Sequence, residues 1–183
     1  MEYIKTPFEG LYVVQPRVFE DDRGYFFESY NRNRERDAKL SYNWVQDNEA
    51  FSERGVLRGL HYQTGSSSQA KLVRVIQGSV QDVVVDLRPQ SKRYGQHYSI
   101  ILSSENKKQL LVPRGFAHGY LVISEEAIFA YKCDNYYNKA AEGGLLFSDP
   151  ALEIPWLLAQ NSFIVSEKDE VLPVFGQHLA VNL

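Results

Sequence analysis

Apolar and polar residues alternate with a period of two along the middle of the chain, which predicts β-strands. The segment 71–76 (KLVRVI) alternates in this way, Gln77-Gly78 predicts a turn, and 80–87 (VQDVVVDL) predicts the returning strand. A short strand interrupted by Pro16 is expected at 5–19, and further short strands are expected at 25–30, at 98–102, at 109–112, around Phe116–Tyr120 and at 127–133. At least eight short strands separated by turn residues predict an all-β sandwich or barrel.

Only a few short helices are expected. The segment 31–40 (NRNRERDAKL) is the best helix candidate of the first half, and 166–173 (SEKDEVLP) predicts one helical turn that carries Lys168 and Asp169. The segment 44–51 (WVQDNEAF) has a mixed pattern, and 145–156, which contains two prolines, is expected to be a loop.

One predicted strand carries several polar side chains. The run 56–63 (VLRGLHYQ) places Arg58, His61 and Gln63 among apolar residues, and the polar loop 64–69 connects it to the next strand. Two interpretations remain open at this point: the wall of a pocket, or a sheet with a polar outer face.

Composition narrows the class of protein. A chain of 183 residues that is 44% hydrophobic and rich in Tyr and Phe is expected to form one β-rich domain, residues 1–183. A net charge of −3 without a basic block argues against nucleic acid as a partner. A single cysteine, Cys133, excludes an internal disulfide and fits a reducing compartment. The N-terminus predicts no signal peptide, and no apolar run reaches the roughly 18 residues of a membrane span, so we expect a cytoplasmic protein.

The histidines raise the question of a metal site. His61 and His118 lie in apolar strands, whereas His97 and His178 lie in polar surroundings and are expected at the surface. PRGFAH, which ends at His118, has the Pro-x-Gly-x-x-His arrangement of the second cupin motif. Metal-binding cupins need a first motif of His-x-His followed closely by Glu, but here the motif is His61-Tyr62-Gln63 and no Glu follows at 65–69. Two histidines without an anionic ligand make a poor transition-metal site, so the pattern predicts a cupin barrel without a metal.

An ordered set of motifs then identifies a family. The chain resembles the dTDP-4-dehydrorhamnose 3,5-epimerase family over nearly its whole length, although the match is less tight at 49–55. The segments that carry the resemblance are FEDDRGYFFE (19–28), QDN (46–48), GVLRGLHYQ (55–63), KLVRVIQGSVQDVVVDLR (71–88), ENKKQLLVPRGFAHGYLV (105–122), YKCDNYY (131–137) and SEKD (166–169). The resemblance implies a cupin-type jelly-roll β-barrel, a homodimer with possible exchange of N-terminal strands, and catalysis without a cofactor.

The resemblance also implies a reaction and its catalytic residues. The substrate would be a dTDP-linked 4-keto-6-deoxyhexose, whose C4 ketone acidifies the hydrogens on C3 and C5. His61 matches the base that removes them, which suits an imidazole because it titrates near neutral pH. Asp169 matches the partner that orients this ring, Lys71 matches the group that stabilises the enolate oxygen, and Tyr131 matches the acid on the opposite face.

The remaining matches are substrate-binding positions. They are Arg23, Arg58 and Lys168 for the diphosphate, Glu28, Gln46, Asn48 and Glu142 for polar contacts to nucleotide and sugar, His118 as a second histidine near the sugar, and Phe26 and Tyr137 for packing against the thymine and sugar rings. Two alternatives stay open: an epimerase that inverts only C3 or C5 of a related sugar, and a cupin that binds a nucleotide sugar without turning it over. The second needs neither an acid nor a base, so the implied catalytic set argues against it.

Overall fold

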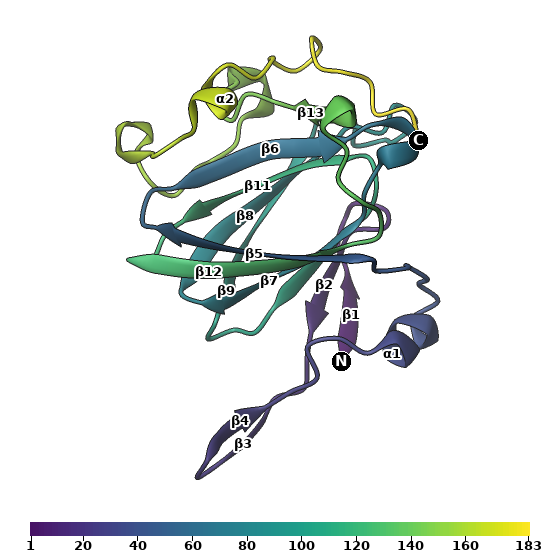
Figure 1. Cartoon of the computed structure of the whole chain (residues 1–183), viewed down its shortest axis with the longest axis vertical. Coiled ribbons are helices and arrows are strands. Elements are labelled where there is room, and N and C mark those ends of the chain that lie inside the picture. Colours follow the sequence, from purple (N-terminus) through teal and green to yellow (C-terminus); the bar gives the residue numbers. More distant parts are fainter.

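Two antiparallel sheets face each other in the computed structural model, which describes residues 1–183 (Figure 1). The first contains, in spatial order, β1 (Glu2–Lys5), β2 (Tyr12–Gln15), β10 (Gln109–Val112), β7 (Lys71–Gln77), β12 (Glu126–Cys133) and β5 (Gln46–Glu53). The second contains β13 (Glu142–Gly144), β6 (Leu57–Gln63), β11 (Phe116–Val122), β8 (Ser79–Asp86) and β9 (His97–Ser103). The prediction of an all-β jelly-roll barrel is confirmed.

The helices are short, as predicted. They are α1 (Arg32–Asp37) and α2 (Glu167–Glu170), with the 3₁₀ turns η1 (Gly65–Ser67), η2 (Lys139–Ala141), η3 (Pro150–Leu152) and η4 (Gln160–Ser162). Asn31 begins α1, because its side-chain oxygen accepts hydrogen bonds from the backbone N–H groups of Asn33 and Arg34. None of these helices is long and apolar enough to cross a membrane.

The main core lies between the two sheets. On β7, Val73 and Val75 are buried in this core, and Lys71 has the same parity along the strand. Phe129 of β12 and Tyr120 of β11 stack in the core with ring centroids 4.1 Å apart. Because side chains alternate between the two faces of a strand, a polar residue with the parity of the core residues, such as Lys71, faces the inside of the barrel.

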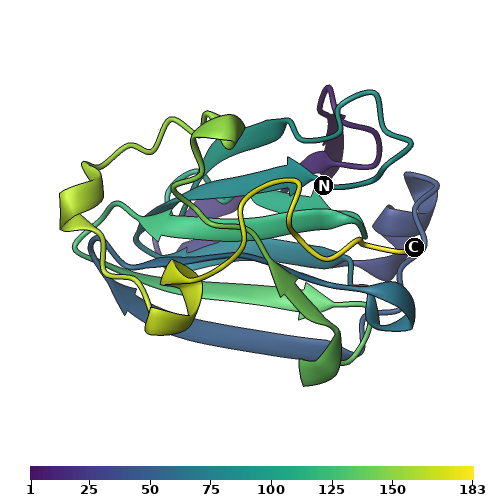
Figure 2. The same cartoon turned by 90° about the horizontal axis from the view of Figure 1, so that it is seen from above.

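A second core covers the outer face of the second sheet. Leu145, Leu152 and Val181 of the C-terminal part of the chain pack against Leu60 and Val83. Figure 2 shows this C-terminal segment crossing the sheet. Strand β8 is consequently buried on both faces, so that its polar residues Gln81, Asp82 and Asp86 are buried together with its valines.

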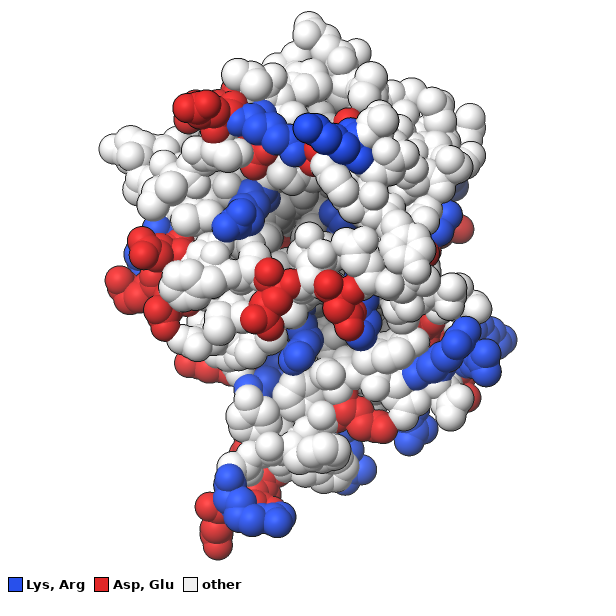
Figure 3. Space-filling view, viewed as in Figure 1, with Lys and Arg blue, Asp and Glu red and all other residues white.

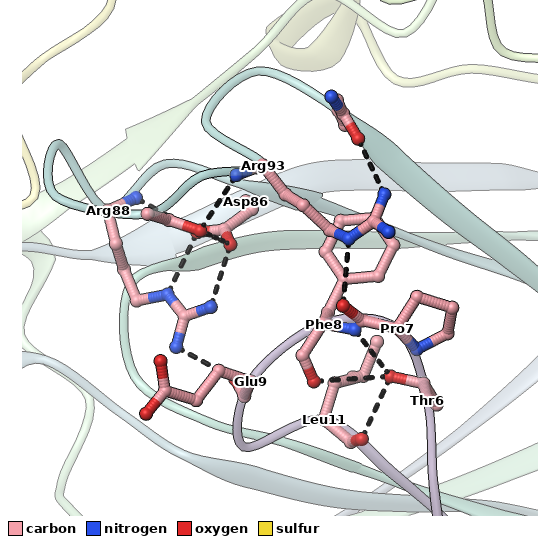
Figure 4. Close-up of polar contacts among 10 residues, drawn as sticks. Thr6, Pro7, Phe8, Glu9, Leu11, Asp86, Arg88 and Arg93 are labelled. Atoms are coloured by element: carbon pink, nitrogen blue, oxygen red, sulfur yellow. Dashed lines mark hydrogen bonds and ion pairs between the residues drawn. The ribbon is translucent and has the colours of Figure 1, made fainter.

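A buried ion pair ties the N-terminal loop to the end of β8 (Figure 4). The carboxylate of Asp86 is fully buried and accepts hydrogen bonds from Nε and Nη2 of Arg88, at 2.9 and 2.7 Å. Arg88 also donates to the carbonyl of Glu9 at 2.9 Å, and Arg93 donates to the carbonyl of Pro7 at 2.8 Å. A buried charge needs such compensation, so these contacts hold the loop after β1 against the barrel.

The structure corrects three local predictions. The aromatic strand expected at 25–30 ends at Phe26, because β4 (Gly24–Phe26) pairs only with β3 (Phe19–Asp21) in a hairpin that projects from the body (Figure 1). The segment expected to form one interrupted strand at 5–19 contributes to β1, β2 and β3 instead. The mixed segment 44–51 lies largely in β5, because it pairs along its length with β12.

Candidate active site

A cavity of about 600 Å³ opens between the sheets, and its lining contains residues of both sheets and of the segment 164–169. A smaller cavity of about 290 Å³ adjoins it, and His61, Lys71 and Tyr131 line both. Figure 3 shows this face hollowed, with Lys and Arg side chains at the rim of the hollow. The three residues shared by both cavities mark the centre of the candidate site.

His61 and Asp169 form a hydrogen-bonded pair at this centre. Nε2 of His61 lies 2.7 Å from Oδ1 of Asp169, and the backbone N–H of Gly59 donates to Oδ2 at 3.2 Å. A Cβ on residue 59 would lie 2.5 Å from the Cα of Gly119, so the close approach of strands β6 and β11 requires glycine there. Burial acts to raise the pKa of Asp169, but the hydrogen bonds and charge of its partners outweigh it and lower the pKa.

The position of Asp169 depends on the C-terminal segment. Ile164 forms a β-bridge with Val56 at the start of β6, and Ser166 caps the short helix α2. The buried side chain of Asp169 is thereby directed at His61 from outside the strand. The predicted helical turn and the implied His–Asp pairing are both present.

Lys71 has a free ammonium group at the same centre. Its Nζ forms no ion pair or hydrogen bond with the chain and lies 5.9 Å from the centroid of the Tyr131 ring. Burial lowers the pKa of Lys71, while Cys133, Asp82 and Glu142 act to raise it. An unpartnered donor of this kind is available to an oxygen atom of a ligand.

Tyr131 faces the cavity from the first sheet, whereas His61 belongs to the second. The hydroxyl group of Tyr131 makes no hydrogen bond with the chain. Burial raises the pKa of Tyr131 to about 12, so the phenol keeps its proton at neutral pH. The structure thus places a proton acceptor and a proton donor on opposite walls of one cavity.

A second His–Asp pair lies beside the first. His118 on β11 is the register partner of His61, and its Nε2 lies 2.9 Å from Oδ2 of Asp82. Both residues of this pair are buried. Sequence reasoning found His118 but missed Asp82, although an Asp inside the apolar run 80–87 signals a buried carboxylate that needs a partner.

Charged residues surround the centre. The guanidinium of Arg58 is held only by weak contacts, with Nε 3.2 Å from Oγ of Ser52, and it has no carboxylate partner. Lys168 is paired with Glu142 at 2.5 Å, and the hydroxyl of Tyr137 donates to the same carboxylate at 3.0 Å. Burial acts to raise the pKa of Glu142, but these two hydrogen bonds outweigh it and lower the pKa.

Gln46 and Asn48 line the smaller cavity from β5. Nε2 of Gln46 donates to Oδ1 of Asn48 at 3.0 Å, and its Oε1 accepts from the backbone N–H of Tyr137 at 3.2 Å. The two amides therefore lie on one face of β5, and they connect this strand to the loop that carries Tyr137.

Three predicted binding residues lie elsewhere. Arg23 is on the projecting hairpin, where it pairs with Asp21 at 2.6 Å and its side chain is 89% exposed. Phe26 is 67% exposed on the same hairpin, and Glu28 accepts a hydrogen bond from Asn31. The structure does not bring these residues to the cavity of their own chain.

The metal question can be restated from the structure. His61 and His118 are each engaged by a carboxylate, and Gln63 occupies the second position of the first cupin motif. No group of three or more His, Cys, Asp or Glu side chains is arranged so that it could hold a metal ion.

Comparison with known proteins agrees with this geometry. The profile described as dTDP-4-dehydrorhamnose 3,5-epimerase matches residues 5–177. A dTDP-4-dehydrorhamnose 3,5-epimerase of Salmonella typhimurium is 45% identical over 180 residues, which cover 98% of each chain. The crystal structure of the enzyme of that name from Elizabethkingia anophelis superimposes with a TM-score of 0.91 at 51% identity, covering 96% of each chain.

A solved complex is similar as well. The dTDP-6-deoxy-D-glucose-3,5-epimerase of Legionella pneumophila, crystallised with dTDP-4-keto-L-rhamnose, has a TM-score of 0.90 at 42% identity over 94% of this chain and 92% of that one. Both the sequence likeness and the structural likeness extend over nearly the whole chain. The chain belongs to the dTDP-4-dehydrorhamnose 3,5-epimerase family and is an isomerase of the cupin jelly-roll fold.

Proposed function

We propose that this enzyme inverts C3 and C5 of dTDP-4-keto-6-deoxy-D-glucose and so forms dTDP-4-keto-L-rhamnose, a step of dTDP-L-rhamnose biosynthesis. One observation carries the proposal: His61 and Tyr131 face one cavity from opposite sheets, with the free ammonium of Lys71 between the two cavities that they line. Inversion at carbon needs a base on one face of the sugar and an acid on the other. No cofactor takes part in this chemistry.

The first step is removal of a proton by His61. Nε2 of His61 donates its hydrogen to the ionised Asp169, so Nδ1 carries the lone pair that accepts the proton from carbon. The carboxylate fixes this tautomer and stabilises the imidazolium that forms. The electron pair of the broken C–H bond moves toward the C4 carbonyl, and negative charge develops on its oxygen.

Lys71 stabilises this oxygen. The ammonium has no other partner, so it meets the developing charge without giving up an existing contact. A donor placed where charge develops lowers the barrier by roughly 3–4 kcal/mol. Tyr131 then delivers its proton to the opposite face, and the configuration of the carbon is inverted. His61 then releases its added proton to solvent and Tyr131 regains one from solvent, and the same two transfers at the second carbon complete the reaction, because one ketone acidifies both positions.

The other polar residues of the cavities bind the substrate. Arg58, which has no carboxylate partner, and Lys168 at the rim suit the diphosphate. His118, held by Asp82, suits a hydroxyl group of the sugar. The residues that suit the remaining polar and ring contacts are Gln46, Asn48, Tyr137 and Glu142.

We also propose a homodimer in which the β3–β4 hairpin of one chain completes the site of the other. The hairpin exposes Phe19, Tyr25 and Phe26, an apolar surface that water does not favour. Arg23 and Glu28 would then reach the diphosphate and the nucleotide of the neighbouring site, and Phe26 would pack on the thymine ring. This explains why these three residues lie far from the cavity of their own chain.

The proposal extends to organisation and location. Residues 1–183 form a single domain, because both ends of the chain pack on the same barrel, β1 in the first sheet and Val181 on the second. The unpaired Cys133 fits a reducing compartment, and we place the enzyme in the cytoplasm.

Proton NMR in D₂O tests the proposed function. With dTDP-4-keto-6-deoxyglucose, the enzyme should exchange the hydrogens at C3 and C5 for deuterium and form the L-rhamno product. The variant His61→Ala should lose exchange at both carbons together. If exchange at C5 survived in this variant, a second base would exist. Binding without any exchange by the native chain would leave only a nucleotide-sugar-binding protein.

A further inference from the structure

The side chain of Gln63 is buried, and only the oxygen of its amide has a hydrogen-bond partner in the chain. It closes strand β6, is 5% exposed and lines the smaller cavity together with His61 and Lys71. Its Oε1 accepts a hydrogen bond from the backbone N–H of Asn138 at 3.0 Å. Because an N–H group needs an acceptor, this contact settles which end of the amide carries the oxygen. The NH₂ group is therefore fixed at the other end.

The NH₂ group of Gln63 makes no hydrogen bond with the chain. It is not one of the fully buried polar atoms that lack a partner, which are the hydroxyl oxygens of Ser68 and Tyr120, so it reaches the open space of the cavity that Gln63 lines. The NH₂ groups of two other amides that line this cavity do have partners: Gln46 donates to Asn48, and Gln69 donates to the carbonyl of Asn135. Gln63 is thus a rigid, nearly buried donor that is left free at the edge of the reaction centre.

Its place on the strand gives this donor a direction. His61 and Gln63 are two residues apart on β6, so their side chains leave the same face about 7 Å apart. Lys71 faces the same cavity from the first sheet. A base that removes a proton from the carbon beside a carbonyl lies close to the oxygen of that carbonyl, and Gln63 and Lys71 line the same cavity as this base.

We propose that the amide of Gln63 is a second donor to the C4 oxygen of the sugar, acting with Lys71 as the oxygen becomes an enolate. The assignment rests on the proposed function, since it requires an enolate at this site. It makes Gln63 a catalytic residue in the position that the first cupin motif gives to a metal ligand. At this position two fixed hydrogen-bond donors stabilise the negative charge on the enolate oxygen, as a metal cation could. No electrons or atoms are exchanged with them.

The competing interpretation is that Gln63 only anchors the loop of Asn138. Two variants separate these roles. Gln63→Glu retains an oxygen that accepts the Asn138 N–H but has no NH₂ donor, whereas Gln63→Met has neither. Loss of one oxyanion donor typically lowers kcat by about 10²–10³-fold. We therefore expect both variants to lose kcat by about 100-fold, with KM changed less than threefold, and to lose deuterium exchange at C3 in parallel.

Other results would overturn the assignment. If Gln63→Glu has native kcat and Gln63→Met is thermally destabilised, the residue is a loop anchor. If Gln63→Glu is slow and Gln63→Met is native, the added charge and not the missing donor is responsible. The native chain measured alongside separates the two proposals: exchange at the native rate in both variants rejects the role of Gln63 alone, and no exchange in the native chain rejects the proposed function itself.

Discussion

Nε2 of His61 lies 2.7 Å from Oδ1 of Asp169, although 108 positions separate the two residues in the sequence. The pair joins the middle of β6 to the short helix α2 in the C-terminal segment, so the orientation of the His61 ring depends on a part of the chain distant in sequence. In the proposed mechanism, Asp169 accepts the hydrogen of Nε2, which leaves Nδ1 as the nitrogen that acts as base.

Asp169→Asn should slow the reaction without unfolding the protein. The amide is isosteric, but it can present its NH₂ group to Nε2 of His61 and so favour the wrong tautomer, and it removes the charge that stabilises the imidazolium. We expect kcat to fall by about 10²–10⁴-fold. Circular dichroism should stay native, and the melting temperature should fall only by the amount that the ionised Asp169 contributes to stability. A loss of less than about tenfold would show that His61 does not need this partner.

The same residue should affect stability in acid. The pKa of Asp169 is lower in the folded protein than the value of about 3.9 expected for the unfolded chain. Its contribution to stability is therefore fully present above about pH 4 and is lost as the pH falls through the lower, folded pKa. Urea unfolding of native protein and Asp169→Asn from pH 7 to pH 2.5 should show a smaller acid loss in the variant, because Glu142 and the other carboxylates are common to both. Equal losses would contradict the shifted pKa.

The strands could be predicted from the sequence wherever one face of a sheet is buried. Alternation over 71–76 predicted β7, and the same parity turned Lys71 into the barrel beside Val73. The pattern failed at 25–30, because a hairpin that has no sheet above or below it leaves aromatic residues exposed and carries no periodic signal of its limits. It was also silent at β5, whose polar residues lie at the free edge of the first sheet.

Some residues of the candidate site could be predicted from the sequence and others could not. Residue types and family motifs indicated His61, Lys71 and Tyr131, which the fold brings to one cavity. Two features could be established only from the structure. Asp82 lies in the segment 71–88 that carries the family resemblance, but its pairing with His118 depends on the register between β8 and β11. The free NH₂ group of Gln63 depends on a single backbone contact from a distant loop.

Mixing two inactive variants tests the exchanged hairpin. Arg23→Ala should impair the site of the partner chain, and His61→Ala should inactivate the site of its own chain. In a mixed dimer, one site then receives both an intact His61 and an intact Arg23, so activity should return after the variants are unfolded and refolded together. Sedimentation of each variant should show a dimer. If Arg23 served its own chain, or if the chain were a monomer, mixing would restore nothing.

Removal of metals should leave the reaction unchanged. The proposed charge stabilisation comes from Lys71 and the proposed acid from Tyr131, so no step needs a Lewis acid. Dialysis against a chelator, followed by the assay in metal-free buffer, should give the native kcat and KM. A stoichiometric, tightly bound transition metal in the active protein, or recovery of activity only on its addition, would contradict this prediction.

Tyr131→Phe should separate proton exchange from inversion. Phenylalanine keeps the ring and its packing against Phe129, whose centroid lies 6.1 Å away, but it removes the hydroxyl group. His61 still forms the enolate and Lys71 still holds it, so the enolate is reprotonated mainly from the original face after the proton has exchanged with solvent. Loss of a general acid typically costs about 10²–10⁴-fold. Product formation should fall by this factor, whereas deuterium exchange at C3 should fall much less.

The dependence of the rate on pH independently tests the assignment of Tyr131 as the general acid. Because burial raises the pKa of Tyr131 to about 12, ionisation of this phenol should not limit the native enzyme below about pH 11. The variant and the native enzyme should therefore show the same alkaline limb over the range in which the protein is stable. If exchange and inversion fall together in Tyr131→Phe, or if neither falls, Tyr131 is not the acid, and the exposed Tyr137, which donates to Glu142, becomes the residue to substitute next.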